Sequence, residues 1–365
     1  MPEALKNVYN KLFIDNLSGE FAVVHKAFDR NRFARTVFST GWQQLELKAR
    51  MRRISESLRE CLPKDFRTSV NILVTVSANM QRTHHTGYEF MLFPDYIELC
   101  GQDHFDISIR ALEQITLLAS AEFAVRPFIL RFPKKMMQVM YVWSKSDNEH
   151  IRRLASEGCR PRLPWAMALP GFKENPRPVL RILKRLKSDS SLYVRRSVAN
   201  NLNDISKDHP ALVIDLVKSW MGKNKDTDWL VKHACRGLLK NAYPDAMQLF
   251  SFGKVDHLKI RCFKLPEIVV FGNYLPYSFD VVSSTENIGN LRIEYALDFM
   301  KANGKTARKI FKISESNYLE AAKSISRRHV FKHISTRKHY PGKHGFAILL
   351  NGTQIVQKYF VLEFV

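Results

Sequence analysis

Apolar residues recur at helical spacing over roughly the first 250 residues of the chain. In one clear example, steps of three and four separate Leu47, Met51, Ile54, Leu58 and Cys61, and most of the residues between them are basic or polar. This pattern predicts an amphipathic helix with a basic outer face that ends at Pro63. The stretch 66–101 is rich in β-branched residues, and we interpret it as helical too. The stretch 123–143 predicts one long helix.

A unit of roughly 40 residues repeats in the later part of this helical region. Acidic residues precede three related tripeptides, which are Ile151-Arg152-Arg153, Val194-Arg195-Arg196 and Val231-Lys232-His233. Repeats of this length built from paired helices are typical of HEAT-like solenoids, in which each pair stacks on the next. The second helices of successive units then line one concave face, so we expect the arginine pairs there. Trp143 and Trp220, which precede two of these units, are predicted to lie in the core.

After Pro266 the pattern changes to short β-rich runs separated by Gly, Asn and Pro turn signals. The predicted strands are 268–271, 279–284, 291–299, 309–313, 324–333, 346–350 and 355–365. About seven strands in this length predict an immunoglobulin-like sandwich, although the antibody Cys–Trp–Cys pattern is absent. The predicted fold is therefore mainly α, with a HEAT-like helical domain over 1–253, a linker over 254–266 and an all-β domain over 267–365.

The composition narrows the class of partner. Of 365 residues, 45% are hydrophobic, which is too many for a disordered chain, and the formal net charge of +22 indicates a polyanionic partner. No apolar run is long enough to span a bilayer, and the N-terminus lacks the apolar segment of a signal peptide. The five scattered cysteines are typical of reduced thiols. We expect a cytoplasmic monomer without a membrane partner.

Two segments resemble the HEAT-like-repeat alkylpurine DNA glycosylases: RRLASEGCRPRLPW at 152–165 and YVRRSVANNLNDISKDHP at 193–210. Helices followed by an Ig-like domain resemble the AlkC branch of that family, because the AlkD branch lacks the sandwich. The resemblance implies a bacterial, nucleoid-associated, monofunctional glycosylase that needs no cofactor. It also implies double-stranded DNA as partner and cationic lesions such as N3-methyladenine and N3-methylcytosine as substrates. The base would be excised without being flipped into a pocket, unlike in most glycosylases.

The resemblance also places the functional residues. The catalytic acids fall on Glu122, Glu157 and Asp204, with Trp165 beside them. A carboxylate near the sugar favours the positive charge that develops as the glycosidic bond breaks, and it can hold the attacking water. An aromatic face can lie against the sugar or the cationic base. The predicted DNA contacts are Arg152, Arg153, Arg160, Arg162, Arg195, Arg196, Asn200 and Asn201, followed by Lys338 and Lys343 in a basic finger over 336–345.

Each of these residues also has a structural interpretation. Glu157 and Arg153, like Glu122 and Arg126, are spaced for ordinary helical ion pairs. Asp204 could cap a following helix. Trp165 could fill the core between repeats, the arginine pairs could form a solvated face, and the basic finger could be an exposed turn without a role.

Other interpretations concern the whole protein. His329, His333, His339 and His344 could indicate a metal, but no cysteine or carboxylate joins them at ligand spacing, so we favour no metal. The chain could instead be a non-catalytic HEAT protein that binds DNA structures. It could also be a scaffold whose basic face meets an acidic protein.

Overall fold

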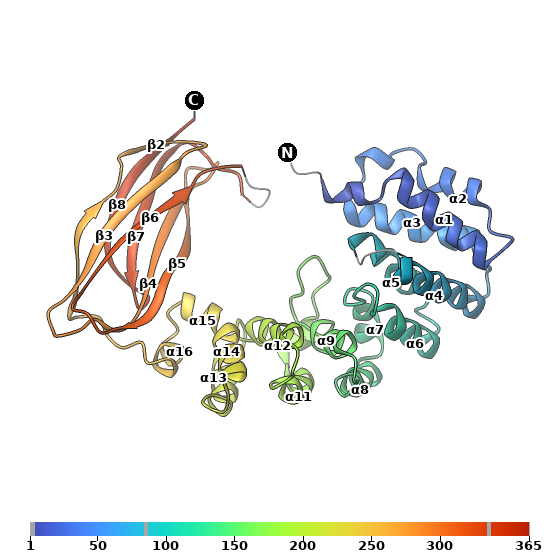
Figure 1. Ribbon diagram of the computed structural model, residues 1–365, viewed down its shortest axis with the longest axis horizontal. Helices are drawn as coiled ribbons and strands as arrows, with labels where there is room; N and C mark the ends of the chain where they lie inside the picture. The colour runs from blue at the N-terminus through green and yellow to red at the C-terminus, as the bar shows by residue number, and fades with distance from the viewer. Residues whose placement is uncertain (1–3, 84–86, 334–336, 365) are drawn as a thin grey trace. The chain divides into compact units, whose positions relative to one another are not determined.

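The computed structural model describes residues 4–83, 87–333 and 337–364, and shows helices followed by β-sheets, as the sequence predicts (Figure 1). It separates into two compact units. The helical unit comprises Met1–His209 and Trp220–Ala234, and the sandwich unit comprises Pro210–Ser219 and Cys235–Val365. None of the helices in the described ranges combines the length and apolarity needed to cross a bilayer.

Short helices connected by tight turns build the helical unit. Its α-helices are α1 (Lys11–Val24), α2 (Arg30–Val37), α3 (Leu47–Cys61), α4 (Phe66–Thr83), α5 (Leu92–Cys100), α6 (Phe105–Ile115), α7 (Val125–Arg131), α8 (Pro133–Trp143), α9 (Glu149–Glu157), α10 (Pro170–Glu174), α11 (Arg177–Leu186), α12 (Leu192–Ile205) and α14 (Lys225–Ala234). The 3-10 helix η1 (Leu5–Val8) precedes α1, while η2 (Trp42–Gln44) and η3 (Tyr88–Met91) lie between α2 and α3 and between α4 and α5. The predicted single helix over 123–143 is wrong. Helix α7 ends at Arg131, Phe132 leaves the helical conformation, and Pro133 begins a second helix. Trp143 and Trp220 are buried, which confirms their core assignment.

Paired helices form the repeats. Helix α9 packs on α12 and α12 packs on α14, so these three form one row, while α8 and α11 form a second row beside it (Figure 1). The side chain of Asn148 caps α9 by accepting a hydrogen bond from the His150 amide. Helix α11 buries Val179, Ile182 and Leu183 completely or nearly so and leaves its basic residues outside.

The first arginine of each Arg-Arg pair joins neighbouring repeats. Arg152 donates to the carbonyls of residues 146 and 147 and forms an ion pair with Asp189 (Nε–Oδ2, 2.7 Å). Arg195 repeats the arrangement: it donates to the carbonyls of residues 189 and 190 and pairs with Asp226 (Nη2–Oδ1, 2.9 Å). The same guanidinium thus fixes the turn before its own helix and reaches an acid of the next repeat.

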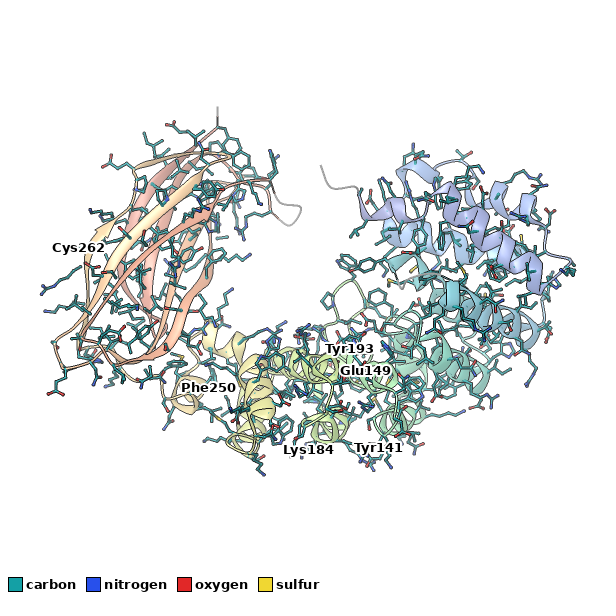
Figure 2. The ribbon with its side chains drawn as sticks, in the orientation of Figure 1. Tyr141, Glu149, Lys184, Tyr193, Phe250 and Cys262 are labelled. Carbon is teal, nitrogen blue, oxygen red and sulfur yellow. The ribbon has the colours of Figure 1, made fainter. Side chains whose placement is uncertain are left out.

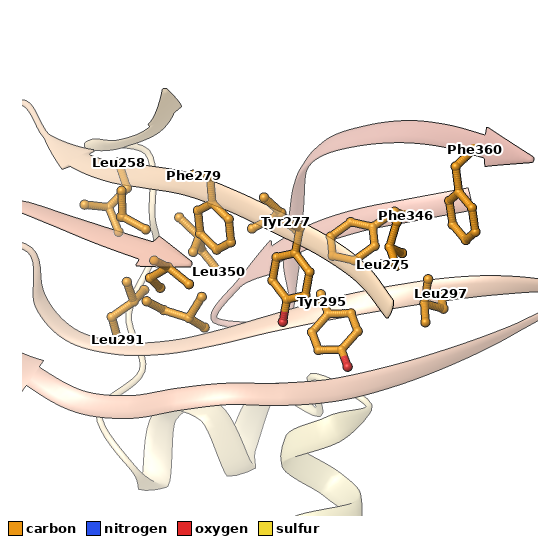
Figure 3. Packing of buried hydrophobic residues seen from close by; sticks show 14 of the residues in the cluster. Leu258, Leu275, Tyr277, Phe279, Leu291, Tyr295, Leu297, Phe346, Leu350 and Phe360 are labelled. Atoms are coloured by element: carbon orange, nitrogen blue, oxygen red, sulfur yellow. The ribbon is translucent and has the colours of Figure 1, made fainter. Parts of the chain in front are cut away.

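Two sheets form the sandwich. One has the order β1-β3-β6 and the other β2-β8-β7-β4-β5; within the described residues β2 and β8 run parallel, and the other paired strands run antiparallel. The strands are β1 (Leu258–Lys264), β2 (Ile268–Val270), β3 (Tyr274–Ser283), β4 (Gly289–Met300), β5 (Thr306–Tyr318), β6 (Ala322–Val330), β7 (Gly342–Leu350) and β8 (Thr353–Glu363). Leu275, Tyr277, Phe279, Leu291, Phe346 and Leu350 belong to the core between them (Figure 3).

Each of the seven predicted strands coincides with an observed strand, although the bounds differ. Val365, the last residue of the predicted 355–365 strand, lies outside the described residues. Strand β1 occupies part of the segment 254–266, which we predicted to be a linker. The sandwich unit also includes α13 (Pro210–Lys218), α15 (Arg236–Lys240) and α16 (Pro244–Leu249). The side chain of Asn290 ties α16 to β4 by donating to the Phe250 carbonyl (2.8 Å). The predicted end of the DNA-binding and catalytic domain at residue 253 stays a prediction.

Candidate active site

A pocket of about 700 Å³ opens in the helical unit where α9 and α12 meet the turns before α7 and after α9. Charged and aromatic side chains line it side by side. They include Glu122, Phe123, Arg153, Glu157, Arg160, Trp165 and Tyr193. The structure therefore brings together three of the four predicted catalytic residues, and the fourth, Asp204, lies directly behind Arg160.

Acidic and basic side chains alternate through this site. Arg153 joins Glu122 to Glu157, and its Nη2 lies 3.6 Å from Glu157 Oε1. Arg160 joins Glu157 to Asp204, through Nη1–Oε1 and Nε–Oδ2 distances of 2.6 and 2.8 Å. Three carboxylates and two guanidinium groups thus form one chain of charges inside the basic protein. Burial lowers the pKa of Arg153 and Arg160, but their carboxylate neighbours outweigh this and raise it, so both guanidinium groups stay charged.

Glu157 has the most constrained carboxylate of the set. It is the last residue of α9, and its side chain is only 6% exposed. Ser197, on α12, donates to Glu157 Oε2 at 2.7 Å, and the Ser156 hydroxyl lies 2.7 Å from that of Ser197. Both carboxylate oxygens therefore have fixed partners, and the carboxylate edge that reaches the pocket has a defined orientation.

Asp204 lies within α12 and is almost fully buried. Its second oxygen, Oδ1, lies 3.3 Å from Lys207 Nζ. The helix-capping interpretation is wrong, because α12 continues through Asp204 to Ile205. Arg160, which lines the pocket, contacts Asp204 and lies between this carboxylate and the pocket.

Glu122 accepts hydrogen bonds from Ser120 (Oγ–Oε2, 2.8 Å) and from Arg153. The predicted helical pair with Arg126 is wrong. Arg126 is completely buried and donates to three carbonyls, those of Gly158, Arg160 and Met167, at 2.7 to 2.9 Å. It therefore holds both ends of the loop that carries Arg160 and Trp165.

Trp165 has a strained backbone and an exposed ring. Its φ is 63°, a region that non-glycine residues adopt only when surrounding contacts hold them there. One such contact comes from Lys48, which donates to the Trp165 carbonyl at 2.8 Å. The side chain is 60% exposed, so the interpretation of Trp165 as a core residue is wrong. The indole borders the pocket together with Phe123 and Tyr193.

Comparisons with known proteins agree with this geometry. A family model described as "DNA alkylation repair enzyme" matches residues 115–238, and one for the C-terminal Ig-like domain of the YhaZ protein matches residues 259–364. Uncharacterized protein YhaZ of Bacillus subtilis (strain 168) is 44% identical over 350 residues, which cover 95% of this chain and 96% of that one. The alkylpurine DNA glycosylase AlkC of Pseudomonas fluorescens, solved with DNA that contains an abasic-site analogue, is 36% identical. It covers 99% of this chain and 100% of its own, with a TM-score of 0.93.

The chain belongs to the AlkC branch of the HEAT-like-repeat alkylpurine DNA glycosylase family. The family models match both of its parts: the first covers α7 to α14 and includes Glu122, Glu157 and Asp204, and the second covers the strands of the sandwich.

The arginine and asparagine residues of this AlkC-branch protein differ in their access to a ligand. Arg152 and Arg195 join repeats, and Asn201 is fully buried, with its amide donating to the Ser156 carbonyl at 2.8 Å. In this structure Asn201 offers no exposed surface to DNA, and contacts by Arg152 and Arg195 would require breaking these ion pairs. Arg196, Asn200 and Arg162 are closer to solvent. Arg196 is exposed and Asn200 is partly exposed, while Arg162 forms an ion pair with Asp208 (Nη2–Oδ1, 2.7 Å).

The predicted basic finger differs from the structure. Thr336 lies outside the described residues, and β7 begins at Gly342, so Lys343 lies on a strand. Lys338 and Lys343 are exposed, and their ammonium groups lie over the rings of Tyr340 (5.5 Å) and Tyr359 (4.3 Å).

The four histidines considered as metal ligands lie among aromatic rings. His329 pairs with the Tyr295 hydroxyl at 2.8 Å, His339 and His344 are buried, and His333 is exposed. In the described part of the chain, no three His, Cys, Asp or Glu side chains are arranged to hold a metal ion.

Several site residues had weak signals in the sequence. Ser197 follows Tyr193 by one helical turn, but a serine on a helix face has no distinctive pattern. Tyr193 borders the pocket and is covered by Arg153, whose guanidinium carbon lies 4.9 Å from the ring centroid. Arg126 was detectable, because a single arginine inside the apolar run AEFAVRPFIL requires buried partners.

Proposed function

We propose that this protein is a monofunctional DNA glycosylase that hydrolyses the N-glycosidic bond of cationic alkylated bases, N3-methyladenine and N3-methylcytosine, in double-stranded DNA. The observation that carries the proposal is the chain of three carboxylates held by Arg153 and Arg160 at an exposed, aromatic-lined pocket. The relative from Pseudomonas fluorescens, an alkylpurine DNA glycosylase solved with DNA, supports the same reaction class.

The chemistry follows from the charge that moves during bond cleavage. An N3-alkylated base is already cationic and therefore leaves readily, and its departure transfers positive charge to the sugar. Glu157 and Glu122 face the pocket and would stabilise that charge, most effectively where water is scarce. One of them would also orient the attacking water. Trp165 and Tyr193 offer aromatic faces to a cationic base or sugar. Because these groups approach the lesion in an open pocket, the base need not be flipped into a closed one.

Asp204 would be a positioning residue. It fixes Arg160 from behind, and Arg160 in turn orients Glu157. Exposed cations such as Arg196, Lys338 and Lys343 would contact phosphates, which implies binding that weakens as salt rises. The acids at the centre would reduce affinity for intact DNA and favour a cationic lesion.

The test is release of free base from methylated duplex DNA, identified by mass spectrometry, with the strand checked for breaks. We expect free N3-methyladenine and N3-methylcytosine and an intact abasic strand. Asp204→Asn should bind undamaged duplex at least as well as the wild type, while base release collapses. Asp208→Asn is the matched control, because this acid pairs with Arg162 at the surface. Wild-type release by Asp204→Asn would remove Asp204 from the mechanism.

One observation favours the alternative of a non-catalytic, DNA-binding HEAT protein: each of the three acids already has an arginine partner. In that case the protein would bind duplex DNA with the same salt dependence, but no free base would appear.

A further inference from the structure

The row formed by α8 and α11, which we call the outer row, carries a second set of cations. Tyr141 and Lys184 lie on α8 and α11, on the side of these helices away from Tyr193 (Figure 2). Neither α8 nor α11 contains an acidic residue. We call the following side chains the outer basic face: Lys134, Lys145, Arg177, Arg181, Lys184 and Lys187.

These cations differ from those of the pocket in their partners. Arg153 and Arg160 each contact two carboxylates, whereas no member of the outer basic face forms an ion pair with an acid in the described ranges. The nearby Lys135 is neutralised by Asp106 (2.9 Å) and is therefore not part of the face. The outer basic face keeps its full charge available for a partner.

A groove of about 420 Å³ runs between α8 and α11 within this face. Lys134, Tyr141, Arg177 and Arg181 are among the residues that line it. The guanidinium carbon of Arg181 lies 3.8 Å from the Tyr141 ring centroid, and Lys145 Nζ lies 4.7 Å from it. A hydrogen bond from Arg181 and the charges of Arg181 and Lys145 lower the pKa of the Tyr141 phenol, as expected where positive potential accumulates.

We propose that the outer basic face binds a second segment of duplex DNA, so that one protein molecule holds two duplexes. Charge complementarity carries the choice of partner. Arg177, Arg181 and Lys184 follow one another at i, i+4 and i+7 along α11, which spaces fixed charges over roughly 10 Å of one ridge. Such a ridge, without an acid to repel it, matches the regular phosphates of a duplex. Two DNA sites let a repair protein move between segments without full release.

The experiment uses a biotinylated short duplex on beads and a second, fluorescent duplex free in solution, at about 50 mM salt. Wild-type protein bound to the first duplex should capture the second, and sedimentation should show one protein for two duplexes. The triple variant Arg177→Glu, Arg181→Glu, Lys184→Glu should lose at least tenfold of the captured fluorescence, while its binding to the first duplex persists. The matched control Lys26→Glu, Arg32→Glu, Arg35→Glu changes net charge equally at exposed positions elsewhere in the helical unit.

Three outcomes would overturn the inference: no capture by the wild type, undiminished capture by the outer variant, or equal loss in the control variant. An acidic protein as the true occupant would produce the first of these. Base release measured on a single duplex separates this proposal from the proposed function. Suppose that neither the wild type nor any variant releases base, and that only the outer variant loses capture of the second duplex. The glycosylase proposal then fails, and the second DNA site stands.

Discussion

Each unit buries an arginine between two carboxylates, but the two triads join different kinds of structure. In the helical unit, Arg160 pairs with Glu157 and Asp204 at 2.6 and 2.8 Å. In the sandwich unit, Arg292 pairs with Glu294 and Glu315, both at 2.6 Å. The guanidinium side chains are equally buried, at 8% exposure each.

The surroundings of the two triads decide their roles. Arg292, Glu294 and Glu315 lie on the paired strands β4 and β5, where they hold one sheet together. Glu157 ends a helix, and Arg160 lies on the irregular loop that follows, so both border the pocket. A buried ion pair is therefore not itself a sign of catalysis. It becomes a candidate site where a loop presents it to a ligand.

The largest effect is expected from breaking each triad at its centre. Arg160→Met and Arg292→Met each remove the buried cation that two carboxylates share, which costs about 3–5 kcal/mol of unfolding free energy. We expect both variants to melt earlier in thermal unfolding. Base release should be lost only in Arg160→Met, measured at a temperature where both variants stay folded. Equal release by the two variants would show that both triads are structural.

Low pH should reduce the unfolding free energy of the sandwich unit, because His329 is partly buried there. Burial lowers the pKa of His329 to about 4, against about 6.5 in an unfolded chain. The unfolded state therefore binds more protons between these values, so this stability is present above about pH 6.5 and is lost as pH falls towards 4.

The expected loss between pH 7 and pH 4 is about 3 kcal/mol, and His329→Asn should remove it, because its amide can replace Nδ1 as partner of Tyr295. Denaturant unfolding followed from pH 7 to pH 4 measures it. A variant with the same pH dependence as the wild type would exclude His329 as the cause.

The smallest effect concerns the aromatic wall of the pocket. Trp165→Ala should lower base release by roughly tenfold, the loss of about 1–2 kcal/mol expected for a desolvated cation–π contact. Trp165→Phe should recover part of that loss, and both variants should melt like the wild type because the ring is exposed. Unchanged release by Trp165→Ala would remove the indole from the account.

The order of the elements could be predicted from the sequence, and so could the grouping of the acids with arginines. The i,i+4 pair of Arg153 and Glu157 exists, but at 3.6 Å it is looser than the contact of Glu157 with Arg160 at 2.6 Å. Arg160 lies beyond the end of α9, where helical periodicity no longer tells which side chains meet. The link from Arg160 to Asp204 spans 44 positions and depends on how repeats stack.

The misses have physical causes as well. Strand β1 was overlooked because Cys262 adopts a positive φ of 51° and the pairing register shifts between Arg261 and Lys264, which disturbs the alternation. The alternation over 291–295 is real, but its polar residues Arg292 and Glu294 are buried by pairing. The two arginines of one pair cannot be told apart in the sequence, although Arg152 joins repeats and Arg153 borders the pocket.

The most direct test compares one isosteric change in each triad. Glu157→Gln and Glu294→Gln both replace a buried, arginine-paired carboxylate by a neutral amide. Single-turnover release of N3-methyladenine from duplex DNA, with enzyme in excess, should fall by about a hundredfold or more in Glu157→Gln and stay at the wild-type rate in Glu294→Gln. If a folded Glu157→Gln variant released base at the wild-type rate, this would contradict the claim that the Glu157 carboxylate stabilises the positive charge on the sugar as the base departs.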